Sequence, residues 1–338
     1  YSQEDYALNE LAKTIKGKLP MEVVRQVYNG QLVAEPMTLT KALEEYTRYK
    51  SDEGVSDKDV AKRIAKLRKD LSDAIGEHKL KHVPLADITR ADANAFRDHL
   101  LERMQPNSVL RNVAVVKAAV NYVLSEHSLN LPNVFNGLKI KGAGTSKDDR
   151  HPLTEADIAV AEPRFMGDPI AWALFATLVD TGARVAEVAG LLVQDVDLQG
   201  RSLRISPNTI RGLKTKGSNR VIPLSPRALE LLQGFRQGKE DTEPLFTKYA
   251  RVRGNDACSA MLMKRLRTVI TDKKLTIHSL RHRMKDKLRN TDCPEDVSLA
   301  ILGHSTNTVA ANYGSGYALE VMREHMEKVW QYTKKRVL

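Results

Sequence analysis

The stretch His278-Ser279-Leu280-Arg281-His282 is the part of the sequence from which the fold and the chemistry are best inferred. His278 and Arg281 stand three residues apart, so on a helix they lie on one face. Leu302-Gly303-His304 follows a second predicted helix, and Tyr313 comes nine residues after His304. An arginine, two histidines and a tyrosine supply the charge, the hydrogen-bond donors and the nucleophile that attack on a phosphodiester requires.

Two cationic groups upstream of this stretch extend the set. Arg184 lies in Thr181-Gly182-Ala183-Arg184-Val185-Ala186-Glu187, at the predicted start of a helix, and Lys214 lies in Leu213-Lys214-Thr215-Lys216-Gly217. Each residue alone is more often structural, since a tyrosine usually packs and a Gly-His pair after a helix often only ends it. Their joint occurrence in this order makes one shared catalytic site the better interpretation.

The order and spacing of Arg184, Lys214, His278, Arg281, His304 and Tyr313 resemble those of the tyrosine recombinase (phage integrase) family of DNA strand-exchange enzymes. The resemblance covers about residues 36–330. It implies a mainly α fold with a small antiparallel β-sheet, in which a helical core-binding domain and a tyrosine recombinase catalytic domain form a two-domain DNA clamp. The sequence departs from the family at Arg283, where Thr is common, and at 307–312, which lack the frequent paired Thr. Neither departure removes a side chain that the expected reaction requires.

The chemistry expected of each group follows from its side chain. Arg184 and Arg281 would neutralise the non-bridging oxygens, because a planar guanidinium meets two oxygens at once and stays charged. His278 and His304 would hydrogen-bond the same phosphate, and His278 would exchange a proton with the nucleophile. Tyr313 would be that nucleophile; its phenol, with a reference pKa of about 10, needs the positive field of these groups to ionise.

The family resemblance adds two supporting roles. It implies that a lysine of a hairpin protonates the departing 5′ oxygen. Lys214 and Lys216 compete for this role, and the Lys-Thr pair with its distance to Ile222-Pro223-Leu224 favours Lys214. The resemblance also implies that Glu187, about one turn after Arg184, braces the site.

No cofactor and no metal ion are expected. The arginine pair would do the work that Mg²⁺ does in other phosphoryl-transfer enzymes, and no Asp/Glu cluster shows metal-ligand spacing. His278 and His282, four residues apart, form a possible metal pair, but no third ligand is evident nearby.

The charge of the chain points to a polyanionic partner. Its 338 residues include 53 Lys and Arg against 42 Asp and Glu, a formal net charge of +11. Only 5% of the residues are aromatic, so phosphate contacts are expected in place of extensive base stacking. For any single lysine, a solvated face is the alternative. The residues expected to contact double-stranded DNA are Lys62, Arg63, Lys66, Lys69, Arg111, Lys117, Lys216 and Arg283.

Five segments are expected along the chain. Residues 1–34 would form an N-terminal helical arm of unknown role, and residues 35–140 a helical core DNA-binding domain. The small, polar residues 141–151 predict a linker. Residues 152–317 would form the catalytic domain, and residues 318–338 a C-terminal tail helix.

Periodicity supports these assignments. In the helical domain, the apolar residues at steps of three and four are Val60, Ile64, Leu67, Leu71 and Ile75. In the catalytic domain, strands are expected at 202–206 and 220–224, with the lysine hairpin between them. The Met- and Trp-containing stripe of the tail helix suits packing on its own domain or on a neighbouring protomer. Exchange between protomers, which the family resemblance implies, is the favoured interpretation.

The resulting hypothesis is a site-specific DNA recombinase that cleaves and rejoins strands through a covalent 3′-phosphotyrosine, without a metal, and integrates or excises a phage or other mobile element. A non-catalytic DNA-binding relative and a type IB topoisomerase-like enzyme are the alternatives. The expected partners are double-stranded DNA target sites and further copies of the chain, as a tetramer on two sites, with accessory DNA-bending proteins as further candidates.

The cellular setting is expected to be the cytoplasm of a bacterium, with the protein bacterial or phage-encoded and associated with the nucleoid. Cys258 and Cys293 stand in unlike contexts and are expected to be reduced thiols. No signal peptide and no apolar run of membrane-spanning length appear in the sequence, so no membrane contact is expected.

Overall fold

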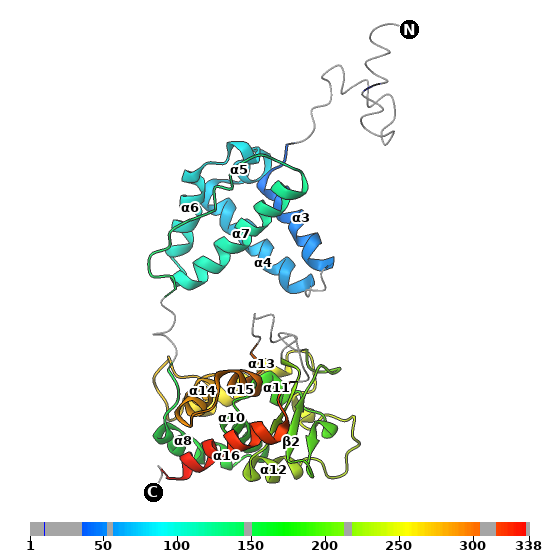
Figure 1. The fold of residues 1–338 in the computed structure, drawn as a ribbon. Coiled ribbons are helices and arrows are strands. Elements are labelled where there is room, and N and C mark those ends of the chain that lie inside the picture. Colours follow the sequence, from blue (N-terminus) through cyan, green and yellow to red (C-terminus); the bar gives the residue numbers. More distant parts are fainter. Residues whose placement is uncertain are drawn as a thin grey trace. The chain divides into compact units, whose positions relative to one another are not determined.

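The computed structural model describes residue 10 and residues 36–52, 57–144, 151–212, 218–304 and 316–335. The chain divides into two compact units, Tyr1–Ser146 and Lys147–Leu338 (Figure 1). The expected arm 1–34, except residue 10, lies outside the described residues, as do Lys214, Lys216 and Tyr313.

The first unit, in its described part, is a helical bundle. Its elements are α3 (Leu39–Asp52), α4 (Asp57–Ile75), α5 (Glu77–His82), the 3₁₀ turn η1 (Leu85–Asp87), α6 (Arg90–Leu101) and α7 (Pro106–Glu126). One apolar core joins these helices, with Leu43, Leu67, Phe96 and Val116 among its fully buried members. The unit therefore has a core of its own.

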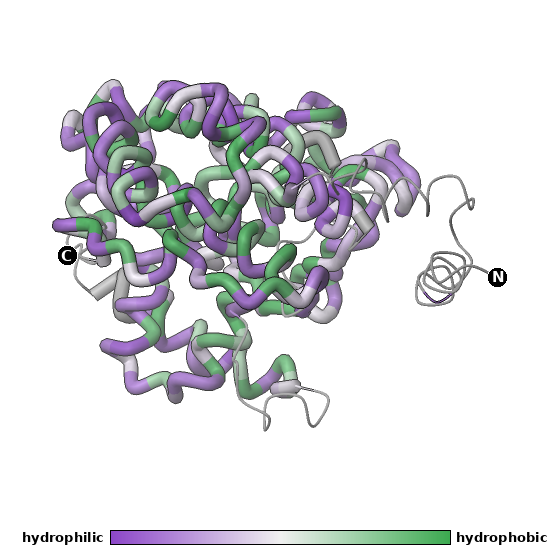
Figure 2. The backbone as a smooth tube through the Cα atoms, turned by 90° about the horizontal axis from the view of Figure 1, so that it is seen from above, coloured by the Kyte–Doolittle hydropathy of each residue, from purple (hydrophilic) through white to green (hydrophobic). Residues whose placement is uncertain are grey.

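Helix α4 shows why this sequence forms a bundle. Ile64, Leu67 and Leu71 recur at helical spacing and are buried, whereas Lys62 and Lys66 are exposed. Figure 2 shows the same alternation of hydrophilic and hydrophobic residues along many helical turns. One apolar stripe against the core and one charged stripe toward water stabilise a helix that propensity alone would leave marginal.

The second unit combines helices with a small sheet. Its elements before the sheet are α8 (Glu155–Ala161), α9 (Pro163–Met166), α10 (Pro169–Thr181), α11 (Val185–Ala189) and the 3₁₀ turn η2 (Val193–Asp195). The elements after it are α12 (Pro226–Gln233), the 3₁₀ turn η4 (Thr247–Tyr249), α13 (Gly254–Leu266), α14 (Ser279–Asn290), α15 (Glu295–Leu302) and α16 (Leu319–Lys335). Helix α10 is buried on nearly all sides, and Phe175 stacks on Phe165 with ring centroids 3.9 Å apart.

The sheet has three antiparallel strands in the order β1 (Val196–Asp197), β2 (Ser202–Ile205) and β3 (Arg220–Pro223). The pairs Ser202–Pro223 and Ile205–Arg220 define the register of β2 and β3. The two predicted strands are therefore present as a hairpin, and β1 is an addition that the sequence did not suggest. The chain between β2 and β3 contains 213–217, outside the described residues.

Helix α16 packs on its own unit. Met322, Met326 and Val329 are buried in an apolar cluster with residues of α14 and α15. The Nε1–H group of Trp330 donates to the carbonyl of Asp180 at 2.9 Å. The stripe that favoured exchange between protomers is thus covered within this chain, and exchange of the helix stays a prediction.

The ends of the predicted linker are held by the two units. The backbone N–H of Gly144 donates to Asn107 Oδ1 at 2.8 Å, which ties the chain to α7 up to that residue. Beyond the linker, Thr154 and Asp157 form a capping box that starts α8. In the part of the chain that the structure describes, no helix combines the length and apolar character that crossing a membrane needs.

Candidate functional site

A sharp turn between α10 and α11 places Arg184. Helix α10 ends at Gly182, whose φ of 64° is the left-handed conformation that glycine adopts at little cost. The backbone N–H of Arg184 then donates to Glu187 Oε2 at 2.8 Å and starts the short helix α11. Glu187 thereby serves both the backbone and the side chain of the same arginine.

The guanidinium of Arg184 is held at three points. Its Nη1 donates to Glu187 Oε1 at 2.6 Å and to Ser218 Oγ at 3.2 Å. Its Nη2 donates to the carbonyl of Gly303 at 3.2 Å. The side chain keeps 21% of its surface exposed. Arg184 is thus oriented by the protein while part of its guanidinium faces solvent.

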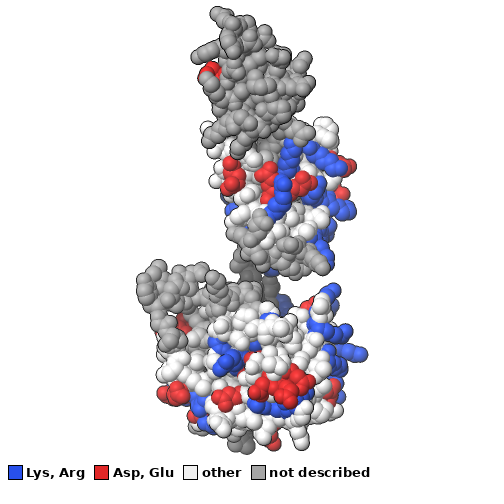
Figure 3. Space-filling model, turned by 90° about the vertical axis from the view of Figure 1, so that its right-hand side faces the viewer, with Lys and Arg blue, Asp and Glu red and all other residues white. Residues whose placement is uncertain are grey.

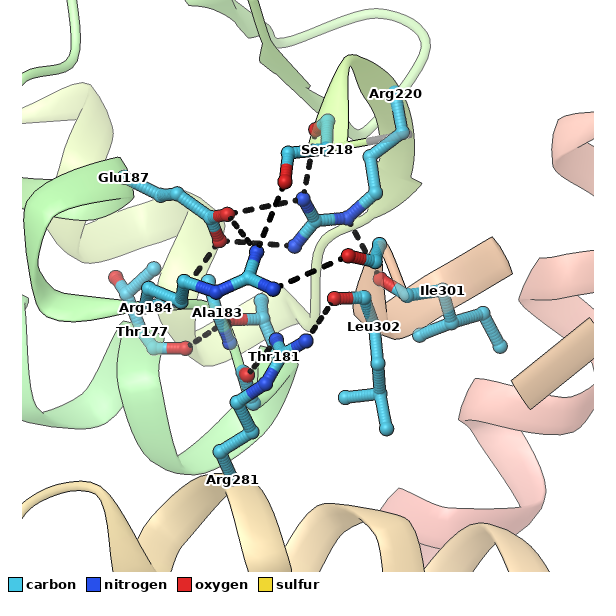
Figure 4. A network of polar contacts seen from close by, with 12 residues as sticks. Thr177, Thr181, Ala183, Arg184, Glu187, Ser218, Arg220, Arg281, Ile301 and Leu302 are labelled. Carbon is cyan, nitrogen blue, oxygen red and sulfur yellow. Dashed lines mark hydrogen bonds and ion pairs between the residues drawn. The ribbon is translucent and has the colours of Figure 1, made fainter. Parts of the chain in front are cut away.

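Arg281 comes from helix α14 and reaches the same turn. Its Nη1 donates to the carbonyl of Gly182 at 2.9 Å, and its Nη2 donates to the carbonyl of Leu302. Arg184 and Arg281 thereby contact the consecutive carbonyls of Leu302 and Gly303, as Figure 4 shows for the surrounding network. The two predicted arginines, 97 positions apart in the sequence, converge on one turn.

His304 is placed by the end of α15. Gly303 has a φ of 61°, and the backbone N–H groups of Gly303 and His304 donate back to Ala300 and Leu299. This Schellman motif ends the helix and directs the chain at His304 toward the arginines. His304 is exposed. The helix-ending role and the proposed catalytic role of Gly-His are therefore compatible.

His278 precedes the first residue of α14, one turn before Arg281. It is exposed, and its ring meets that of His282 edge-on with centroids 5.2 Å apart. The sequence prediction that His278 and Arg281 share one helix face agrees with this position. No third metal ligand for the His278–His282 pair occurs among the described residues.

Positive charge shifts the pKa values at this site. Burial favours the neutral form of Glu187, yet the hydrogen bonds and charges of Arg220 and Arg184 outweigh it and lower the pKa of Glu187 to about 2. Burial and the charge of Arg184 lower the pKa of Arg281 to about 9. Desolvation and the charges of Arg281 and Arg184 lower the pKa of His304 to about 4. At neutral pH, Glu187 and Arg281 are charged and His304 is a neutral imidazole.

Sequence reasoning missed Arg220, the first residue of β3. Its Nη2 donates to Glu187 Oε2 at 2.9 Å, and its Nε donates to the carbonyl of Ile301 at 2.8 Å. Figure 4 shows the guanidiniums of Arg220 and Arg184 both directed at the Glu187 carboxylate. The sequence feature that could have revealed Arg220 is a basic residue at the start of the strand that follows the lysine hairpin.

The helical unit carries most of the residues that were expected to contact DNA. Lys62, Arg63, Lys66 and Lys69 on α4 are exposed, and Arg63 Nη2 donates to the carbonyl of Arg111 at 3.1 Å. Figure 3 shows Lys and Arg in a band across this unit, beside Asp and Glu side chains. A hollow of about 510 Å³ is lined by Arg63, Lys66, Leu67, Asp70, Arg103, Met104, Gln105, Ser108 and Asn112.

Lys117 differs from this group. It is half-buried, and its carbonyl accepts a hydrogen bond from Asn133 Nδ2 at 2.9 Å. At about 100° per residue, it projects roughly 240° around α7 from Arg111. Lys117 and Arg111 therefore face different sides of the same helix.

The prediction that Arg283 contacts DNA is wrong in this structure. Its side chain is 5% exposed, and its Nη2 donates to both carboxylate oxygens of Glu155 at 2.8 and 2.9 Å. Lys287 Nζ lies 2.5 Å from the same carboxylate. Arg283 thus joins α14 to α8, and burial removes it from the surface that a duplex would touch.

One group among the described residues has the composition of a cation site. Asp70, Asp73 and His99 carry ligand atoms within 4.8 Å of one another. The carboxylates already meet cationic side chains, Asp70 with Arg103 at 2.5 Å and Asp73 with Lys69 at 2.6 Å. These ion pairs balance the negative charge, so the group is a salt-bridge cluster between α4 and the end of α6.

Residues 168–318 match the phage integrase family. The chain is 27% identical over 145 residues to tyrosine recombinase XerC of Pelobacter propionicus, an alignment that covers 42% of this chain and 46% of that protein. It is 23% identical over 268 residues to tyrosine recombinase XerD of Lacticaseibacillus casei, with 72% of this chain and 82% of that protein covered.

The fold resembles that of a solved integrase. The Tn1549 transposon integrase, solved as residues 82–397 with a circular intermediate DNA, superposes with a TM-score of 0.65 at 20% identity. The superposition covers 87% of this chain and 99% of that one. At this level of identity the likeness establishes the fold, while the chain spans about half the length of the XerC relative.

Proposed function

Because this chain belongs, through residues 168–318, to the phage integrase family of tyrosine recombinases, we propose that it recombines DNA at specific sites through a covalent 3′-phosphotyrosine. The observation that carries the proposal is the convergence of Arg184, Arg281 and His304 around the turn at Gly303. Two guanidiniums and an imidazole in one place suit a single phosphate, which is the group that strand cleavage must bind and activate.

The proposed reaction balances without an external energy source. The Tyr313 oxygen attacks the scissile phosphorus while the bond from phosphorus to the 5′ oxygen breaks. His278 accepts the phenolic proton, and Lys214 gives a proton to the departing 5′ oxygen. The products are a 3′-phosphotyrosine and a free 5′-hydroxyl. A 5′-hydroxyl from another strand reverses both steps, because the phosphotyrosine keeps the phosphoester bond.

Arg184 and Arg281 act in this scheme as the electrostatic clamp. Both guanidiniums are held by acceptors of the protein before any substrate arrives. Preorganised donors of this kind need little reorganisation when charge develops on the phosphate oxygens. His304, neutral at pH 7, contributes a hydrogen bond from its ring N–H group, without adding a third full charge beside the arginines.

The chain would act as a tetramer on two duplexes. Exchange between two duplexes requires four strand cleavages, and each protomer supplies one Tyr313. The exposed lysines and Arg63 of α4 would contact phosphates of the duplex, and Lys216 would contact DNA next to the general acid. A phage or another mobile element is the proposed genetic context, and accessory DNA-bending proteins are proposed as further partners.

A nicked suicide duplex tests the proposal. The duplex carries a candidate target site, with a nick placed so that the short cleaved fragment diffuses away. The wild-type protein should accumulate a covalent protein–DNA adduct on a denaturing gel. Tyr313→Phe should form none, because it lacks the attacking oxygen.

Tyr317→Phe is the matched control. Tyr317 lies four residues beyond Tyr313, and its hydroxyl is bound to Asp296. This variant should form the adduct at the wild-type level. An adduct with Tyr313→Phe would contradict the assignment of the nucleophile. Binding with no cleavage by the wild type would favour a DNA-binding relative, and relaxation of a plasmid without the target site would favour a topoisomerase-like enzyme.

A further inference from the structure

The guanidinium of Arg220 is the most highly connected cation among the described residues of the site. Its side chain is 7% exposed. It donates from Nη1 to Glu187 Oε1 at 3.2 Å and to the carbonyl of Ser218 at 2.9 Å, and from Nη2 to Glu187 Oε2 at 2.9 Å. Its Nε donates to the carbonyl of Ile301 at 2.8 Å. Four of its five N–H donors are thereby occupied by acceptors of the protein, which leaves Arg220 little capacity to bind the phosphate itself.

We propose that Arg220 is a positioning residue that holds Arg184 and His304 at the relative positions needed to bind the scissile phosphate. The inference rests on the proposed function and deepens it. It concerns how two groups on different segments keep their relative positions, which the hydrogen bond from Arg184 Nη2 to the carbonyl of Gly303 sets only in part.

The first contact of Arg220 acts through Glu187. Both oxygens of this carboxylate accept from Arg220, and Oε1 also accepts from Arg184 Nη1. A planar guanidinium that meets a carboxylate in this way fixes the plane of the carboxylate. The orientation of the Arg184 guanidinium therefore depends on Arg220 through one shared group.

The second contact acts through the turn before His304. Arg220 Nε binds the carbonyl of Ile301, and a methyl group built on Gly303 would lie 2.5 Å from Arg220 Nη1. The guanidinium thus packs against the backbone of Gly303, the residue whose left-handed conformation directs His304 into the site. A side chain of another shape at position 220 would leave this turn without its support.

The charge of Arg220 supports the same assignment. Together with larger contributions from desolvation, Arg281, Arg184 and Lys285, it lowers the pKa of His304. It also opposes protonation of Arg281 in the same way. Arg220 therefore influences the protonation of Arg281 and His304, two of the groups that are proposed to bind the phosphate.

Two substitutions separate charge from shape. Arg220→Met removes both the charge and the hydrogen bonds. Arg220→Lys keeps the charge, but an ammonium is a point charge that cannot reach Glu187 and Ile301 as a planar fork does. Arg227→Met is the control for the loss of an ion-paired arginine, because Arg227 binds Glu162 and Asp180, each at 2.5 Å, outside the proposed clamp.

Single-turnover cleavage of the nicked duplex is measured beside the dissociation constant for the same DNA. Arg220→Met should lower the cleavage rate about 100-fold, the size of effect typical for loss of one preorganised donor, and change the dissociation constant less than about 3-fold. Arg220→Lys should lower the rate about 10-fold. Arg227→Met should cleave within about 3-fold of the wild type, whatever its loss of thermal stability.

NMR titration of His304 gives a readout that requires no catalysis. Its pKa should rise in Arg220→Met, because a neighbouring positive charge is lost, and should stay at the wild-type value in Arg220→Lys and Arg227→Met. An unchanged pKa in Arg220→Met, or wild-type cleavage by it, would overturn the proposal. Should Arg220→Met not fold, wild-type cleavage by Arg220→Lys overturns it, and a loss of about 10-fold supports it.

A DNA substrate with a 5′-bridging phosphorothiolate distinguishes a catalytic defect in the arginine clamp from a defect in Lys214. Its thiolate leaving group needs no acid, so a defect in Lys214 would be rescued and a defect in the clamp would persist. Persistence of the Arg220→Met loss supports the proposal, and rescue overturns it. A wild-type protein that forms no adduct at all would refute the proposed function instead, while the His304 titration would still decide whether Arg220 controls this site.

Discussion

Met284 on α14 packs against the backbone of Gly182, so closely that a methyl group built on Gly182 would lie 2.6 Å from Met284 Cβ. The carbonyl of the same glycine accepts the hydrogen bond from Arg281 Nη1 at 2.9 Å. Two residues later the chain reaches Arg184. The close approach of α14 to this turn therefore sets the separation of the two arginines that are proposed to bind the phosphate.

Gly182→Ala should destabilise the catalytic unit by about 2–4 kcal/mol, because alanine is strained at the left-handed φ and its methyl group overlaps Met284. Urea denaturation measures the change. Gly167→Ala is the matched control, since a methyl group there meets no atom within 4 Å and the backbone is right-handed. Equal stability of the two variants would show that the turn tolerates a side chain.

Glu187→Gln should remove a pH-dependent part of the stability. The folded pKa of about 2 lies below the reference value of 4.5, so the ionised carboxylate stabilises the fold above pH 4.5, and this contribution is lost as the pH falls from 4.5 toward 2. The shift corresponds to about 3 kcal/mol. Denaturation of wild type and variant at pH 7 and at pH 3 measures it. The difference between the proteins should shrink at pH 3, and a constant difference would show that ionisation of Glu187 does not stabilise the fold.

His304 should titrate near pH 4 in the free protein and at a higher pH with DNA bound. Desolvation and the surrounding arginines disfavour the imidazolium, whereas a bound phosphate would supply the opposing negative charge. NMR of histidine-labelled protein, with the His304→Gln variant used to assign the signal, follows both titrations. A pKa of about 6.5 in the free protein would mean that the arginine charges do not reach this ring.

Lys66→Gln and Arg283→Gln should affect different properties. Lys66 is exposed on α4, so its loss should reduce the slope of log K against log salt for duplex binding by about 1 and leave stability unchanged. Arg283 is buried with Glu155, so its loss should cost about 3 kcal/mol of stability and leave the salt slope unchanged. Binding titrations at several salt concentrations and urea denaturation test the pair. A changed slope with Arg283→Gln would restore it as a DNA contact.

Local sequence signals predicted much of the secondary structure. The apolar spacing of Ile64, Leu67 and Leu71 predicted α4. The strands around Leu203 and Ile222 were likewise expected and are paired. These signals act within a few residues, because helix periodicity and caps are local properties of the chain. Arg184, Arg281 and His304, which were grouped from their types and order in the sequence, lie around one turn in the structure, and their catalytic roles stay predictions.

Only the tertiary structure decided which charged residues serve the site and which hold the fold. Arg283 looks like any other basic residue in the sequence, yet Glu155, 128 positions away, buries it in an ion pair. Arg220 looks like the first residue of an ordinary strand, yet Glu187 and Ile301 place it at the centre of the proposed clamp. The stripe of α16 looks like an interface and is covered by α14 and α15 of its own chain. The sequence determines which groups are present and the local elements that carry them. The partner of a charge or an apolar face depends on contacts between distant segments, which exist only once the chain has packed.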